Sequence, residues 1–374
     1  MPIANHELLK PEFWASAFEM IEQGNYELQN HVTRKTELEG NKVGNKLNVP
    51  VANDPTPAGE WDGLSNASEQ TQQVSEYEVV LNYIPYKKFS IAPIESSRSP
   101  YDLLNEFGKV NLEGLLLSVN DRIYRELLSG TNIIDGRSTF DEDTLTDVRT
   151  ILARNKTGLD RKMFLSSGDM GVLLKTNAFK LALNSGTTDA QVEGRIGRKS
   201  GLDLYEFHSS ETYTPTDLVG NSTNALAVNQ TSMVVSNFVD NTRPIRVGDI
   251  FTVAGETGTP LHTVTGTTRD GSNNTINISF SPSIVSVVSA NAVITVTPTR
   301  SILAFTRNSL ALACTTLAPT LDGLGKISKV INMNGLPVRY TIWSGDNTGI
   351  TVQMDCLIGM KAVRPERRIV RVLR

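Results

Sequence analysis

Cysteine and histidine are both scarce in this chain of 374 residues, which has two cysteines and four histidines. Cys314 and Cys356 lie far apart in sequence, so we expect two buried free thiols in a reducing compartment and no disulfide framework. The histidines are His6, His31, His208 and His262. None of them has a cysteine or carboxylate partner at metal-ligand spacing. The sequence therefore predicts no metal site and no cofactor.

Long apolar runs are also missing. No segment approaches the roughly 18–20 apolar residues that a membrane span needs. The start, "MPIANHELLKPEFW", lacks a basic stretch followed by an apolar one, so we expect no signal peptide. Hydrophobic residues make up 39% of the chain and charged residues 20%, which is typical of a folded globular protein. With a net charge of −4, the chain lacks the overall positive charge of proteins that coat nucleic acid.

Catalytic motifs are not visible either. The stretch "GRIGRKSG" (194–201) fails as a phosphate-binding loop, because Arg198 stands before Lys199 where that motif needs glycine. No G-x-S-x-G stretch occurs, and helix capping explains the acidic pair Asp141 and Asp143. The sequence therefore predicts a protein that is not an enzyme.

Positive charge is absent from residues 47–86, which contain no lysine or arginine and carry a net charge of −6. The front of this segment is rich in proline and glycine. Its back, "SEYEVVLNYI", alternates Tyr77, Val79 and Leu81 as a strand does. We predict a long two-stranded excursion with a loose tip, because structureless loops of this length are uncommon in compact domains.

Helical signals come next. Ser99 is a candidate N-cap before Pro100, apolar residues follow at helical spacing from Leu103, and Gly130 ends the pattern. About 30 helical residues would span about 45 Å, so this helix should cross the body as a spine. A second helix follows through "DEDTLTDVRTILARN", capped by Asp141 or Thr139. Shorter pieces then alternate as strand, helix and strand up to "GLDLYEF".

Lysine is absent from residues 218–299, where seven of 82 residues are charged. Strand-like pieces recur there between turns, for example "DIFTVAG", "LHTVTG" and "TINISF". Short strands at this spacing suggest a small β-barrel or sandwich. The flanking chain has mixed helix and strand character, so the block reads as an insertion.

The end of the chain has the opposite charge. Residues 361–374 carry a net charge of +5, and Ile369, Val370, Val372 and Leu373 favour a strand over a solvated tail. A short amphipathic helix around Phe13–Ile21 is predicted at the other end, and it needs a surface on which to dock.

This order of parts resembles the major capsid proteins of tailed bacteriophages with the HK97 fold, in particular the P22 coat-protein branch with its additional β-domain. The matching stretches are "GRIGRKSGLDLYEFHSS", "RVGDIFTVAG", "INISFSPSIV" and "AFTRNSLALA". The resemblance implies an α+β fold and a subunit that self-assembles into an icosahedral head around double-stranded DNA.

The resemblance also implies a division of the chain into arms and domains. Residues 1–40 would be the N-terminal arm, 41–95 the extended loop over a neighbouring subunit, 96–134 the peripheral domain with its spine helix, 135–217 and 301–361 the axial domain, 218–300 the inserted β-domain, and 362–374 a strand closing the peripheral sheet. Some relatives crosslink through a loop lysine. This loop has none between Lys46 and Lys87, so we expect no crosslink.

Opposite charges suggest where subunits meet. The −6 loop and the +5 terminal strand could join across a subunit boundary, which would steer assembly. Alternatively, both are solvated faces. The candidate contact residues are Asp54, Glu60, Trp61, Asp62, Glu69, Arg364, Arg367, Arg368 and Arg371.

The resemblance implies several partners. They are other copies of the chain in hexamers and pentamers, a separate scaffolding protein, a portal protein, a cement protein and packaged DNA bound without sequence specificity on the inner face. The resemblance implies no interaction with a membrane. It implies a protein of the virion that is assembled in the bacterial cytoplasm. Alternative readings are an encapsulin-like compartment shell, an enzyme with an appended β-domain, and a phage tail or adhesin protein.

Overall fold

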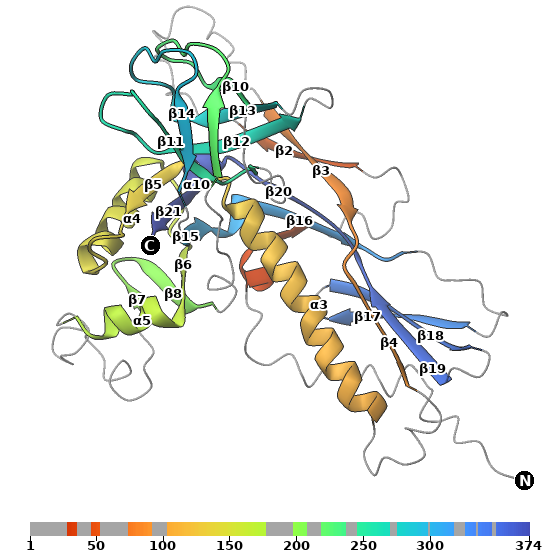
Figure 1. Cartoon of the computed structure of the whole chain (residues 1–374). Helices are drawn as coiled ribbons and strands as arrows, with labels where there is room; N and C mark the ends of the chain where they lie inside the picture. The colour runs from red at the N-terminus through yellow and green to blue at the C-terminus, as the bar shows by residue number, and fades with distance from the viewer. Residues whose placement is uncertain are drawn as a thin grey trace, which may run out of the picture.

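The structure is a computed structural model of the chain (Figure 1). It describes residues 28–35, 46–52, 74–91, 103–176, 197–207, 218–236, 245–269, 275–297, 300–317, 326–333, 336–345 and 349–374. The helix predicted around Phe13–Ile21 and the tip of the acidic excursion lie outside these residues.

The longest described helix, α3 (Leu103–Leu127), confirms the predicted spine, although its predicted cap at Ser99 lies outside the described residues. Apolar side chains at helical spacing form the buried face of α3. They are Leu112, Leu116, Val119, Ile123 and Leu127. A Cβ at Gly130 would stand 2.5 Å from Cγ2 of Ile369, so only glycine lets the end of the helix approach the last strand this closely.

Two sheets pack against the spine helix. The five-stranded sheet has the order β1 (Thr33–Lys35), β16 (Leu310–Thr315), β20 (Leu357–Ala362), β3 (Val74–Tyr83) and β2 (Lys46–Ala52). The four-stranded sheet has the order β17 (Lys326–Met333), β18 (Leu336–Gly345), β19 (Gly349–Asp355) and β4 (Tyr86–Ile91). Buried residues of α3, β16, β18, β19 and β20 share one apolar cluster, so helix and sheets form one core.

The acidic excursion is two-stranded where the structure describes it. Strands β2 and β3 pair antiparallel, with Lys46 opposite Val80 and Ala52 opposite Val74. Val79 is fully buried while its neighbour Glu78 is exposed, as the alternation predicted. These two strands confirm the two-stranded part of the predicted excursion.

A six-stranded sheet, here called the body sheet, forms the second core. Its order is β5 (Asn132–Asp135), β21 (Ile369–Leu373), β15 (Ser301–Thr306), β6 (Arg161–Leu165), β8 (Leu202–Glu206) and β7 (Arg198–Lys199). Met163, Ile302 and Val370 pack in a cluster with helices α4 (Glu142–Arg154) and α5 (Ser167–Leu174). Their neighbours Phe164, Leu303 and Ile369 pack in the cluster of the spine helix. Both faces of the body sheet are therefore buried, which explains why strands such as β15 and β21 have apolar residues at consecutive positions.

Local signals predicted the helices of this region well. Asp141 is the N-cap of α4, and its Oδ1 accepts a hydrogen bond from the backbone N–H of Thr144 at 3.2 Å. The Thr144 hydroxyl oxygen in turn accepts from the Asp141 N–H, which completes a capping box. The predicted cap of the second helix is thereby confirmed as Asp141.

Six strands between Leu218 and Val296 form a closed barrel at the top of Figure 1. The order of its strands is β10 (Ser232–Ser236), β13 (Ile276–Ser281), β12 (His262–Arg269), β11 (Ile250–Val253), β14 (Val293–Val296) and β9 (Leu218–Ser222). Ile276, Ile278 and Phe280 alternate into its core, as their spacing predicted. The first strand pairs with the last, Leu218 opposite Val296, so the chain enters and leaves the barrel side by side.

The strands that follow the barrel belong to different sheets from those that the predicted domain boundaries imply. Residues 301–361 were assigned to one axial unit, yet only β15 joins the body sheet, while β16 to β20 lie in the sheets around the spine helix. The three-residue turn η4 (Arg307–Ser309) carries the chain from one sheet to the other. The last strand, assigned to the peripheral sheet, pairs with β5 and β15 in the body sheet. A strand pattern shows which face is apolar but not which neighbour it pairs with.

Candidate functional site

The basic end of the chain folds back against the body through a sharp turn. Arg364 has left-handed backbone angles (φ 51°, ψ 57°), and Pro365 then starts the one-turn helix α10 (Pro365–Arg368). Strand β21 follows directly, so the predicted strand covers only the last part of residues 362–374. The turn leaves the arginines before β21 on the surface and carries the later ones into the sheet.

The surface arginines line a hollow of about 250 Å³, here called the basic pocket. Its charged residues are Lys156, Asp160, Arg307, Arg364, Arg367 and Arg368. They come from the loop between α4 and β6, from η4, and from the turn containing α10. Five cations and one carboxylate give the lining a net charge of +4. The sequence signal covered only the last three of these cations.

Hydrogen bonds hold the walls of the basic pocket together. The Asn155 side chain donates to the carbonyl oxygen of Arg367 at 3.2 Å, and Arg368 Nη1 donates to the carbonyl oxygen of Asn308 at 2.6 Å. Ser309 Oγ donates to the Arg368 carbonyl oxygen at 3.1 Å. These bonds join segments that lie 59 to 212 residues apart in the chain, so the pocket exists only in the folded body.

Two residues of the basic pocket hold strained backbone. Lys156 (φ 56°) and Arg364 (φ 51°) both occupy the left-handed region that favours glycine. Such positions cost of order 1 kcal/mol or more each, and they concentrate at functional sites. Guanidinium groups present a planar fork that matches carboxylate and phosphate oxygens. The pocket is therefore suited to an acidic protein segment or another anion.

The structure corrects the prediction for Arg371, which is wrong as a subunit contact. Its side chain is 2% exposed. Nη1 donates to the carbonyl oxygen of Leu128 at 2.8 Å, and Nη2 donates to Ser301 Oγ at 3.0 Å. Arg371 thus links the last strand to the end of the spine helix inside the chain. The five candidates in the loop, Asp54, Glu60, Trp61, Asp62 and Glu69, lie outside the described residues.

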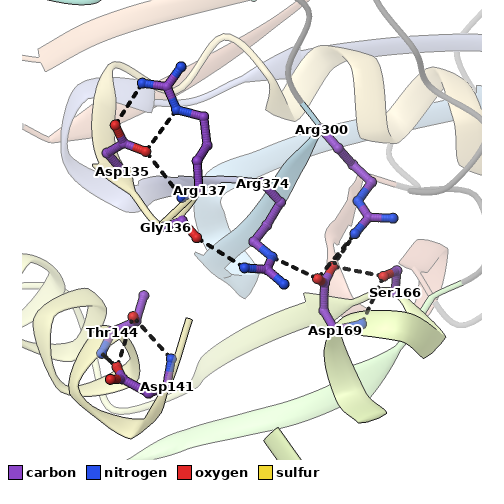
Figure 2. A network of polar contacts seen from close by, with 9 residues as sticks. All are labelled: Asp135, Gly136, Arg137, Asp141, Thr144, Ser166, Asp169, Arg300 and Arg374. Carbon is purple, nitrogen blue, oxygen red and sulfur yellow. Dashed lines mark hydrogen bonds and ion pairs between the residues drawn. The ribbon is translucent and has the colours of Figure 1, made fainter. Parts of the chain in front are cut away.

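A buried carboxylate that sequence reasoning missed fixes the C-terminus (Figure 2). Asp169 is 1% exposed. It accepts from Arg300 Nη2 at 3.1 Å, from Arg374 Nε at 2.8 Å and from Ser166 Oγ at 2.7 Å. Arg300 follows the last barrel strand and Arg374 ends the chain, so one carboxylate joins both to helix α5. The 131 and 205 residues between these partners left no local signal.

A second buried pair lies in the barrel. His262 Nε2 and Glu256 Oε2 are 2.8 Å apart, and both side chains are fully buried. The other ring nitrogen, Nδ1, is 2.8 Å from the carbonyl oxygen of Pro282. Glu256 Oε1 accepts from the Val285 N–H at 2.7 Å. His262 and Glu256 therefore fix two loops at one end of the barrel.

Asp135 and Cys356 are among the groups whose pKa values are shifted. Hydrogen bonds from the Arg137 side chain lower the pKa of Asp135 to about 2 (Figure 2). Burial raises the pKa of the Cys356 thiol far above its usual range. Cys314 and Cys356 are both buried and free, which confirms the prediction of unpaired thiols.

Comparison with solved structures gives the fold. A chain from a structure of Mycobacterium phage Che8 matches at 12% identity and a TM-score of 0.51, covering 92% of this chain and 90% of that one. The capsid of the cyanophage P-SCSP1u matches at 11% identity and a TM-score of 0.52, covering 91% and 86%. The mature capsid of bacteriophage PhiM1 matches at 10% identity and a TM-score of 0.50, covering 92% and 86%. The chain has a phage-capsid fold.

Comparison of the sequence alone found no matching family model and no matching curated protein. Among the described residues, no three His, Cys, Asp or Glu side chains gather as they would around a metal ion. No helix in that part of the chain has the length and apolar character to span a membrane.

Proposed function

We propose that this protein is the major capsid protein of a tailed bacteriophage, with an HK97-like fold. One observation carries the proposal: the phage-capsid fold extends over more than nine-tenths of the chain and over 86–90% of the matched chains. In this role the chain assembles into an icosahedral head that encloses double-stranded DNA, and it catalyses no reaction.

The barrel is, in this proposal, a domain inserted into the capsid fold, as in the P22 coat-protein branch. Its own apolar cluster and its paired first and last strands support this assignment. The partners would be other copies in hexamers and pentamers, a scaffolding protein, a portal protein, a cement protein and DNA on the inner face. Assembly would take place in the bacterial cytoplasm.

Subunit contacts would use the basic pocket. We propose that acidic side chains of residues 47–86 of one copy bind the basic pocket of its neighbour, through Arg364, Arg367 and Arg368. The segment carries −6 and the pocket +4. Exposed ion pairs contribute at most about 1 kcal/mol each, so the effect lies in steering and register and weakens with salt.

A charge swap tests this contact. Arg367→Glu with Arg368→Glu should slow assembly at low salt and remove most of its salt dependence, because repulsion replaces attraction at each contact. Adding Asp62→Lys and Glu69→Lys to the same chain should restore assembly. Light scattering during assembly measures both. Unchanged kinetics in the double reversal, or no recovery in the swap, would contradict the proposed contact.

Sedimentation tests the function itself. The chain is expressed alone and with the scaffolding gene of its own phage, and lysates are run on a gradient. We expect particles far larger than the 40.9 kDa subunit in at least one condition. A matched variant in which an Asn-Gly turn replaces residues 53–73 should fold and remain small, because it keeps the pairing of Ala52 with Val74 but lacks the segment proposed to reach its neighbour. Wild-type chain that stays monomeric in both conditions would refute the capsid role.

A further inference from the structure

A second hollow lies where the barrel meets the end of the spine helix, here called the junction pocket. It encloses about 490 Å³. Helix α3 supplies Arg122, Arg125 and Glu126 to its wall, and the barrel supplies Arg246, with Thr267 beside it. Three arginines and one glutamate give a net charge of +2. Neither the predicted subunit contact nor the basic pocket involves these residues.

Within the part of the chain that the structure describes, the three arginines form no ion pair with a carboxylate. Among the described residues, no hydrogen bond or ion pair holds the guanidinium of Arg122, Arg125 or Arg246. Arg122 Nε is buried without any hydrogen-bond partner, and its guanidinium carbon lies 5.6 Å from the ring centre of Tyr83. Asp121, one turn before Arg125, only influences it through space. A buried donor left unsatisfied is costly, so such groups usually have a ligand or water.

The walls of the junction pocket are fixed from both sides. In the barrel, the Arg246 N–H donates to Asp249 Oδ2 at 2.8 Å and the Gly248 N–H donates to the Val264 carbonyl oxygen at 2.8 Å. On the helix, Glu126 Oε1 accepts from the Ala362 N–H at 3.3 Å, so one oxygen of the only carboxylate among the described lining residues already has a partner. These bonds fix the backbone of the barrel turn and the Glu126 side chain, so a ligand would have to order only the arginine side chains.

We propose that the junction pocket binds a phosphate group. Guanidinium forks match phosphate oxygens in geometry, and a phosphate dianion balances the +2 lining, whereas a single carboxylate neutralises half of it. The pocket volume accommodates a diphosphate. Because Arg122 and Arg125 belong to α3 and Arg246 to the barrel, a bound phosphate joins the two and holds the barrel against the helix. The proposal does not depend on the proposed function.

Calorimetric titration of the full chain with inorganic pyrophosphate tests the site. We expect saturable binding that Arg246→Gln weakens at least about tenfold, since a lost charge-assisted hydrogen bond corresponds to that factor or more. Arg246 is exposed, so this variant should fold normally. Arg122→Gln should have the same effect. Arg367→Gln is the comparison variant: because the basic pocket can also hold an anion, it can weaken a separate binding event, but it should leave the event that Arg246→Gln weakens unchanged.

A short DNA duplex distinguishes the source of the phosphate. Duplex that displaces pyrophosphate, and loses affinity in Arg246→Gln, would assign the phosphate to nucleic acid. Duplex that leaves pyrophosphate bound would assign it to a small ion. The proposal is overturned if pyrophosphate does not bind at millimolar concentration, or if Arg367→Gln weakens its binding while Arg246→Gln does not.

Discussion

His262 lies between two hydrogen-bond acceptors in the barrel core. The Pro282 carbonyl oxygen can only accept, so Nδ1 must carry a proton. One further proton lies between Nε2 and the Glu256 carboxyl group, whichever of the two holds it. The ring is thus held from both sides, and losing either bond would leave a buried polar group without its partner.

Substitutions of Glu256 test this arrangement. Glu256→Ala should lower the free energy of unfolding by about 3–5 kcal/mol, as breaking a buried pair does. Glu256→Gln should cost about 1 kcal/mol, because its amide can donate to neutral His262 while its oxygen still accepts from Val285. Urea denaturation compares them. Equal losses in the two variants would contradict the proposed hydrogen bonding.

His31 should make stability depend on pH. Burial, helped by the nearby charges of Lys162 and Arg307 against that of Asp160, lowers its pKa from 6.5 to about 4. Below pH 6.5 the unfolded chain therefore binds a proton that the folded chain does not, and stability falls as pH drops from about 6.5 towards about 4.

The variant His31→Phe should flatten this part of the pH profile. An aromatic ring at this position keeps the contacts with Phe164 and Tyr205, whose ring centres lie 5.5 and 4.4 Å away. Chemical denaturation at several pH values measures the difference between the two proteins. A wild-type profile as flat as that of the variant would show that His31 does not titrate in this window.

The turn before β11 anchors the barrel on the spine helix. Gly248 has φ 94°, and a Cβ there would stand 2.6 Å from Leu128 Cβ and 3.0 Å from its carbonyl oxygen. Gly258 offers a matched comparison, with φ 81° and nothing within 4 Å of such a Cβ. The two glycines share the backbone strain but not the clash.

Alanine at each position separates these causes. Gly258→Ala should cost about 1–2 kcal/mol from the left-handed backbone alone. Gly248→Ala should cost a further 1–3 kcal/mol, roughly, because the barrel turn must move away from the helix. Thermal denaturation of both variants gives the comparison. Similar losses at the two positions would contradict close docking at Gly248.

Elements with local signals were predictable. The cap at Asp141, the alternation of Ile276, Ile278 and Phe280, and the periodicity of α3 each depend on residues a few positions apart. The neighbours of each strand were not predictable. Strand β21 joins β5 and β15, and the barrel strands close on themselves, through pairings that no local pattern encodes.

The candidate site shows the same division. The positive charge at the end of the chain predicted Arg367 and Arg368 on the surface. It could not distinguish them from Arg371, which the strand carries into the core. Lys156 and Arg307 join the pocket from segments without any charge run. Asp169 was likewise invisible, because its partners Arg300 and Arg374 reach it only in the folded chain.

At the scale of the whole molecule, the barrel should fold on its own. It has a separate apolar cluster, and its first and last strands are paired. Residues 218–299 expressed alone should therefore give one cooperative thermal transition, followed by circular dichroism. A fragment that melts without cooperativity would show that the barrel needs the body to fold.

The body in turn depends on contacts between distant parts of the chain. The last strand completes the body sheet, and Asp169 fixes both the C-terminus and the exit from the barrel. The described part of the excursion, β2 and β3, forms one edge of a sheet beside the spine helix. A monomer gains little from such an edge, whereas a shell subunit can cover it with a neighbour.

Electron microscopy of the expressed protein tests the central claim most directly. The chain is imaged after expression alone and with its scaffolding gene. The capsid assignment predicts closed icosahedral shells of uniform diameter in at least one of the two samples. Monomers or irregular aggregates in both samples, from protein that circular dichroism shows to be folded, would contradict it.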